Sequence, residues 1–160
     1  MKTVKKALAL ILSVLMVFSA TSLAINAEDD LGEKKSELSF AILSDPHYYP
    51  ESLTGGNCQA WLDYCSINTK LFRQSDAIVR TALDTMFARN PGLKYIFVPG
   101  DLTKDSEYLA HTGIAEIFLE YEEKYGVEFL VINGNHDINT TDASTFENGK
   151  KEQTRAITSD

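Results

Sequence analysis

Several features are scarce in this sequence of 160 residues, and each scarcity excludes a class of protein. Only four prolines occur and 44% of the residues are hydrophobic, which excludes a disordered chain and a collagen-like repeat. Basic residues are few, with 15 Lys and Arg against 23 Asp and Glu and a formal net charge of −8. We therefore expect no surface for a nucleic-acid backbone. What remains is the composition of one packed domain.

Long apolar runs are also missing. The longest, residues 7–18, holds about 12 residues, fewer than the roughly 20 that cross a bilayer. Three lysines precede it and small residues follow it up to Ala27, which is the pattern of a cleaved secretory signal peptide. We predict a signal peptide over residues 1–27, a secreted or cell-envelope location, and no stable membrane anchor after cleavage. The alternative is an uncleaved anchor, in which residues 23–25 extend the run.

Residues 28–37 are polar and charged, and we interpret them as a flexible lead-in to a domain over residues 38–160. Export would permit a disulfide between the two cysteines, Cys58 and Cys65. If this segment is helical, the two α-carbons lie roughly 10.5 Å apart, beyond the roughly 7 Å that a disulfide tolerates. If it is a loop, the bond can form. The sequence leaves both possibilities open.

Three short apolar runs alternate with two helical patterns. The runs lie at residues 40–43, 94–99 and 127–132, and the helical patterns at about residues 71–89 and 106–125. Strands that are apolar on both faces and alternate with helices are typical of a parallel sheet with right-handed crossovers, covered by helices. We therefore predict an α/β fold, with a long irregular loop over residues 48–66.

Residues that can bind metal follow each of the three expected strands. They are Asp45-Pro46-His47, Gly100-Asp101 and Asn135-His136-Asp137. We expect them to converge, because α/β proteins bind ligands beyond the carboxyl ends of parallel strands. Carboxylate oxygens and imidazole nitrogens suit zinc, iron or manganese, and a cation would remove the repulsion between clustered carboxylates. Gly100 and Gly134 are expected to let the backbone turn sharply at the strand ends.

In this order, the motifs resemble the fingerprint of the calcineurin-like metallophosphoesterases: Asp-x-His, then Gly-Asp, then Gly-Asn-His-Asp. The match covers about residues 38–140, and the Gly-Asn-His-Asp block is its most specific part. The resemblance implies the N-terminal βαβαβ half of that family's α/β sandwich, with an incomplete sheet. It also implies hydrolysis of a phosphoester substrate by a water molecule that two divalent ions, of manganese, iron or zinc, activate.

The resemblance assigns metal-binding roles to four residues. Asp45 and His47 would hold the first ion, and Asp101 would bridge both ions. Asn135 would bind the second ion through its side-chain oxygen. The physical chemistry agrees, because an aspartate between two ions can use both of its carboxylate oxygens.

The resemblance also assigns the catalytic roles. His136 would lie close to the substrate, where it would hydrogen-bond a phosphate oxygen or protonate the leaving group. Asp137 would orient the ring of His136. Lys104 and Asp105 follow Asp101 in the sequence and could touch a substrate, but nothing in their spacing requires it.

The sequence departs from the family pattern after the Gly-Asn-His-Asp block. Family members supply further metal-binding histidines downstream, and this sequence has no histidine beyond His136. The remaining histidine, His111, lies in the second expected helix, and we interpret it as a surface or packed residue. We therefore expect an incomplete fragment, ending in a polar stretch, that binds metal weakly and turns over poorly. The alternative is a non-enzymatic exported binding module with a vestigial metal site.

Overall fold

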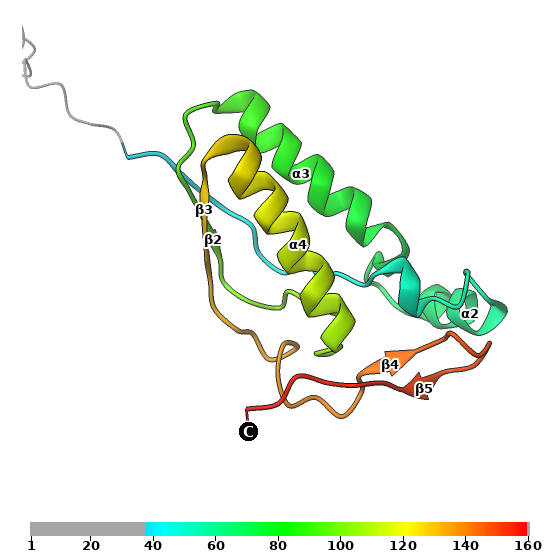
Figure 1. The fold of residues 1–160 in the computed structure, drawn as a ribbon. Helices are drawn as coiled ribbons and strands as arrows, with labels where there is room; N and C mark the ends of the chain where they lie inside the picture. The colour runs from blue at the N-terminus through cyan, green and yellow to red at the C-terminus, as the bar shows by residue number, and fades with distance from the viewer. Residues whose placement is uncertain (1–37, 160) are drawn as a thin grey trace, which may run out of the picture. The chain divides into compact units, whose positions relative to one another are not determined.

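A computed structural model of the chain describes residues 38–159. The predicted signal peptide and lead-in, residues 1–37, lie outside the described residues. The described part has an α/β fold, as predicted (Figure 1). Its main elements are the strands β1 (Phe40–Ile42), β2 (Tyr95–Val98) and β3 (Glu128–Val131) and the helices α3 (Ser75–Arg89) and α4 (Tyr108–Tyr125).

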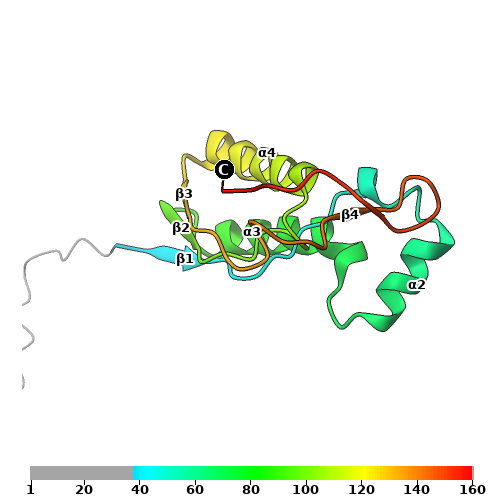
Figure 2. The same ribbon diagram turned by 90° about the horizontal axis from the view of Figure 1, so that it is seen from below.

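The three strands form one parallel sheet, as predicted, and their order is β1-β2-β3 (Figure 2). In register, Ala41 pairs with Ile96, and Ile96 pairs with Phe129. When sequential parallel strands are joined by right-handed crossovers, both connecting helices fall on the same face of the sheet. Figure 1 shows α3 and α4 together on one side of the strands.

The face of the sheet under the two helices holds the main hydrophobic core. Ile96 and Val98, from the central strand, are fully buried. The helices contribute the buried side chains Val79, Leu83, Phe87, Ala110, Ile114, Ile117, Phe118 and Tyr121. Each large apolar side chain that is fully buried contributes about 1.5–3 kcal/mol, so this helical layer holds the strands in place.

Helix α4 has two glycines with different functions. Gly126 ends the helix in the left-handed conformation, at φ 64°, as expected for a helix C-terminus. Gly113 lies inside the helix, where it costs about 1 kcal/mol relative to alanine. A Cβ at Gly113 would lie 2.8 Å from Cε1 of Tyr48. The glycine therefore lets the segment after β1 pack closely against α4.

The other face of the sheet is apolar and is covered by none of the described elements. It presents Phe40, Ile42, Phe97, Leu130 and Ile132, which are between 37% and 64% exposed. The strands are thus apolar on both faces as predicted, but the expected helical cover exists on one face only. An exposed apolar surface of this kind is typical of a face that packs against another element.

The expected loop over residues 48–66 is partly helical, so that prediction is wrong. The segment contains a 3-10 turn, η1 (Glu51–Leu53), and the helix α2 (Gln59–Ile67). Only Trp61 of α2 is buried. The helix therefore lacks the apolar stripe from which a sequence pattern predicts a helix.

Helix α2 also decides between the two alternatives for the cysteines. Cys58 is the residue just before the helix and Cys65 lies in its second turn. Both cysteines are free, which agrees with the separation expected for a helical segment.

A second, smaller core lies against α2. It consists of Tyr49, Leu53, Trp61, Phe72 and Phe146. Phe72, expected on the first long helix, instead lies in a 3-10 turn, η2 (Phe72–Gln74), just before α3. Phe146 follows the first strand of a hairpin, β4 (Ser144–Thr145) and β5 (Glu152–Gln153), which the sequence pattern does not predict. Each strand of this hairpin consists of two polar residues, so the sequence has no alternation of apolar and polar residues that would predict a strand.

Candidate metal centre

The segment after β1 runs beside the segment after β2. The backbone N–H of His47 donates to the carbonyl of Asp101 over 3.0 Å, and that of Tyr48 to the carbonyl of Leu102 over 2.7 Å. These bonds continue the parallel pairing past the ends of the strands. They bring Asp45 and His47 to the same edge of the sheet as Asp101.

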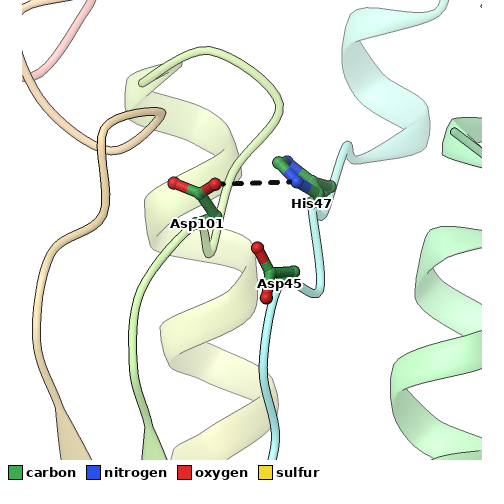
Figure 3. Close-up of side chains that lie close together, drawn as sticks. All are labelled: Asp45, His47 and Asp101. Carbon is green, nitrogen blue, oxygen red and sulfur yellow. Dashed lines mark ion pairs between the residues drawn. The ribbon is translucent and has the colours of Figure 1, made fainter.

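Asp45, His47 and Asp101, which we call the Asp–His–Asp trio, form a compact group (Figure 3). One ligand atom of each residue lies within 4.8 Å of the other two. Nε2 of His47 is 3.8 Å from Oδ2 of Asp101. Ligand atoms that are about 2.0–2.2 Å from one ion are at most about 4.4 Å apart, so small side-chain rotations would complete a coordinated geometry. The structure thus brings together three of the four predicted metal ligands.

The backbone is strained at all three residues of the trio. Asp45, His47 and Asp101 have φ values of 53°, 41° and 52°, in the left-handed region that costs non-glycine residues roughly 1–2 kcal/mol each. Such conformations persist only where the surrounding structure enforces them, and they cluster at functional sites.

Two motif glycines allow the loops to approach each other. Gly100 has φ 106°, and a Cβ there would overlap the backbone of Gly134. A Cβ at Gly134 would overlap the carboxylate and backbone N–H of Asp101. The sharp turn expected at Gly100 is confirmed, whereas Gly134 serves close packing between two loops.

The loop after β3 contacts the trio through its backbone. The N–H of His136 donates to Oδ1 of Asp101 over 3.0 Å. Asn135, the fourth predicted ligand, lies between Gly134 and His136 and is exposed. Asn135 thus immediately precedes the residue whose N–H binds Asp101, and within residues 38–159 its side-chain amide makes no hydrogen bond.

The environment of His47 favours its neutral, metal-binding form. Nδ1 is 3.2 Å from the carbonyl oxygen of Thr103. When Nδ1 carries the proton and donates it to this carbonyl, Nε2 keeps its lone pair and faces Asp101, where it can bind a metal ion. Burial lowers the pKa of His47, and the nearby ammonium of Lys70 lowers it further. Metal binding requires a neutral imidazole, so both effects favour ligation.

His136 is oriented by a residue to which the sequence assigned no role. Its Nδ1 lies 2.9 Å from Oδ1 of Asp105 and 2.8 Å from the carbonyl oxygen of Lys104. Its ring meets that of His47 edge to face, with the centroids 5.0 Å apart. The ring of His136 is thus held between Asp105 and the trio.

Asp137, the residue expected to orient His136, binds backbone amides instead. It is fully buried, and its two carboxylate oxygens accept hydrogen bonds from Thr103 N over 3.1 Å and from Gly134 N over 2.7 Å. Nε2 of His111 lies 2.7 Å from the carbonyl oxygen of Asp137, so His111 is a packed residue. Asp137 joins the second and third loops and acts on His136 only through them.

A buried lysine holds the carboxylate beside His136. Lys104 is fully buried, with Nζ 2.5 Å from Oδ2 of Asp105 and 2.9 Å from Oε1 of Glu107. Burial acts to lower the pKa of Lys104, but these two carboxylates outweigh it and raise the pKa. In the sequence, this cluster is marked by two acidic residues that follow Lys104 one and three positions later. The same pattern is also common on solvated surfaces.

Two comparisons with known proteins found no relative of this chain. No family model matches this chain, and a search of the curated proteins finds no match either. Within residues 38–159, no helix combines the length and hydropathy needed to span a membrane.

Proposed function

We propose that this chain is the N-terminal part of an exported, calcineurin-like metallophosphoesterase, a hydrolase that cleaves phosphoester bonds. The observation that carries the proposal is the convergence of Asp45, His47 and Asp101 at the carboxyl ends of β1 and β2. The uncovered apolar face of the sheet supports a larger layered fold. The basic, apolar and small-residue pattern of residues 1–27 supports export.

The donor set of the trio fits a pair of divalent ions of manganese, iron or zinc. Asp45 and His47 would hold one ion, Asp101 would bridge to the other, and Asn135 would complete that second site. When bound, such ions polarise the phosphoryl group and activate a water molecule at neutral pH. The two carboxylates supply negative charge that offsets the charge of the ions.

The chain's own acid–base group is His136. Because its Nδ1 faces Asp105 and a backbone carbonyl, Nε2 is available to the substrate. From there it donates a hydrogen bond to a phosphoryl oxygen or a proton to the leaving oxygen. Asp105 is a positioning residue, since its carboxylate fixes the ring. Asp137 positions the loop through its two backbone hydrogen bonds.

Calorimetric titration of the purified chain with Mn²⁺ tests the proposal. We expect Asp101→Asn to weaken Mn²⁺ binding at least about 100-fold, because it removes the central carboxylate of the trio. Substitutions of residues that only support a metal ligand already weaken metal binding by about 10–100-fold. Asp63→Asn, which removes an equal charge on the exposed surface of α2, is the matched control and should bind as the wild type does. His136→Ala should keep metal binding while losing any manganese-dependent hydrolysis of an aryl phosphate.

Absence of Mn²⁺ binding by the folded wild-type chain would overturn the proposal and favour a non-enzymatic binding module. Equal binding by wild type and Asp101→Asn would overturn it as well, because the ion would then lie elsewhere.

A further inference from the structure

A cavity of about 270 Å³ opens beside the Asp–His–Asp trio. Asp45 and His47 line one side of it. Ile78 and Val79 from the start of α3, and Leu71 from the connection before it, line the other. A phosphoryl group held at the trio would therefore have this cavity next to it. The group attached to the phosphorus has room there.

Lys70 is the one lysine or arginine among the described residues that line this cavity. Its Nζ lies 3.3 Å from Nδ1 of His47. In the tautomer that leaves Nε2 for a metal ion, that nitrogen donates to the carbonyl of Thr103 and offers Lys70 no lone pair. Within residues 38–159, Lys70 also forms no ion pair. Its ammonium donors are therefore free for an anionic ligand beside the trio.

The other polar groups of the lining are already engaged. The hydroxyl of Ser75 accepts a hydrogen bond from Tyr49 N over 3.0 Å, and the hydroxyl of Ser44 donates to the carboxylate of Asp45. The hydroxyl groups of a sugar would enter an apolar space with few free partners, which is unfavourable. An alkyl or aryl group needs no such partners.

The size of the cavity agrees with a compact apolar group. An apolar protein cavity of roughly 150 Å³ accepts a molecule the size of benzene, so about 270 Å³ accommodates a phenyl ring or a short alkyl chain. Ile78 and Leu71 are 45% and 64% exposed, which leaves the cavity open for entry.

We propose that Lys70 binds a phosphoryl oxygen of the substrate and that the cavity beside it receives the ester group, so that alkyl and aryl phosphoesters are preferred over sugar phosphates. This inference rests on the proposed function, because the trio must first hold the metal ions. Lys70 then supplies a positive charge on the side of the phosphoryl group that faces α3.

Calorimetry with two non-hydrolysable probes, phenylphosphonate and methylphosphonate, tests the inference on the chain saturated with Mn²⁺. We expect phenylphosphonate to bind at least about tenfold more tightly, because the ring buries apolar surface. Lys70→Met should weaken both probes by about tenfold and keep the preference for the ring, since it removes one charge-assisted hydrogen bond. Ile78→Ser should reduce the preference and leave methylphosphonate binding unchanged.

Two matched variants serve as controls. Lys94→Met removes an equal charge at the opposite edge of the sheet, before β2, and Leu119→Ser replaces an exposed leucine on α4. Both should bind the probes as the wild type does, and Lys70→Arg should restore most of the lost affinity. The inference is overturned if Mn²⁺ binds but the two probes bind equally, or if Lys70→Met binds them as Lys94→Met does. A wild-type chain that takes up no Mn²⁺ contradicts the proposed function itself.

Discussion

Two clusters of charged side chains lie at the same edge of this sheet, and they differ in how their charges are compensated. In the first, the ammonium of Lys104 contacts the carboxylates of Asp105 and Glu107, and both Lys104 and Glu107 are fully buried. In the second, the Asp–His–Asp trio, two carboxylates surround an imidazole whose burial favours the neutral form. The first cluster contains its own cation, whereas the second does not.

The difference separates a structural cluster from a candidate metal site. A charge away from water must be paired within the protein or with a bound ion. The Lys104 cluster meets this condition with the chain's own groups, so it serves to hold the loop after β2 in place. The trio is partly solvated, with Asp45 exposed and His47 and Asp101 half-buried, so a cation can replace water there. Its left-handed backbone conformations are of the kind that the surrounding fold enforces.

The largest expected effect comes from removing the internal cation. Lys104→Met should lower the free energy of unfolding by about 3–5 kcal/mol, because it leaves the carboxylate of Glu107 buried without a cation. Urea denaturation measures the loss, and Lys94→Met, at an exposed position, should change stability by less than about 0.5 kcal/mol. If the two variants are equally stable, the Lys104 cluster does not have the structural role assigned to it.

A smaller and opposite effect is expected when a cation is added to the trio. Mn²⁺ at about 100 times its dissociation constant should raise the free energy of unfolding of the wild-type chain by about 2.7 kcal/mol. Asp45→Asn removes one predicted ligand and should abolish most of this gain, whereas Asp63→Asn should retain it. A gain of the same size in Asp45→Asn would show that the ion stabilises the chain from another place.

The smallest expected effect is a pH dependence that belongs to the Lys104 cluster alone. The pKa of Lys104 is raised above its ordinary value of 10.5 in the folded chain, so its ion pairs contribute their full stability below that pH. The contribution is lost as the pH rises through the folded pKa. The difference in unfolding free energy between wild type and Lys104→Met should therefore be constant up to about pH 10 and shrink above it.

Tyr121 does not disturb this comparison, and Tyr64, whose ring centroid lies 5.4 Å from Nζ of Lys104, is removed from it by carrying Tyr64→Phe in both proteins. Burial and a hydrogen bond to Asp84 raise the pKa of Tyr121 to about 12, so both proteins lose stability there in the same pH range, and the loss cancels in the difference. A difference that stays constant to pH 12 would contradict the assigned ion pairs.

The sequence predicted the parts of the site that follow directly from strand order. Parallel strands end at one edge, so the residues after β1 and β2 had to converge, and Asp45, His47 and Asp101 do so. The prediction from sequence failed where the contact depends on the direction in which a side chain points. Asp137 is next to His136 in the chain, but Asp105, thirty-one positions away, is the acid that contacts its ring.

The same distinction applies to the fold. Two apolar stripes predicted α3 and α4, while α2 was missed because it buries one tryptophan and has no stripe. Lys70 left no signal at all, since a single lysine between helices is indistinguishable in sequence from a solvated one. Its proximity to His47 depends on how the connection between α2 and α3 packs against the segment after β1.

The amino-acid sequence by itself determined the order of strands and helices and the set of metal-binding residue types at the strand ends. It could do so because hydrophobic periodicity and short motifs are local properties of the chain. Only the tertiary structure decided which acid contacts His136, which face of the sheet is covered, and which lysine stands beside the trio. Those contacts join residues far apart in sequence, and packing in three dimensions selects them.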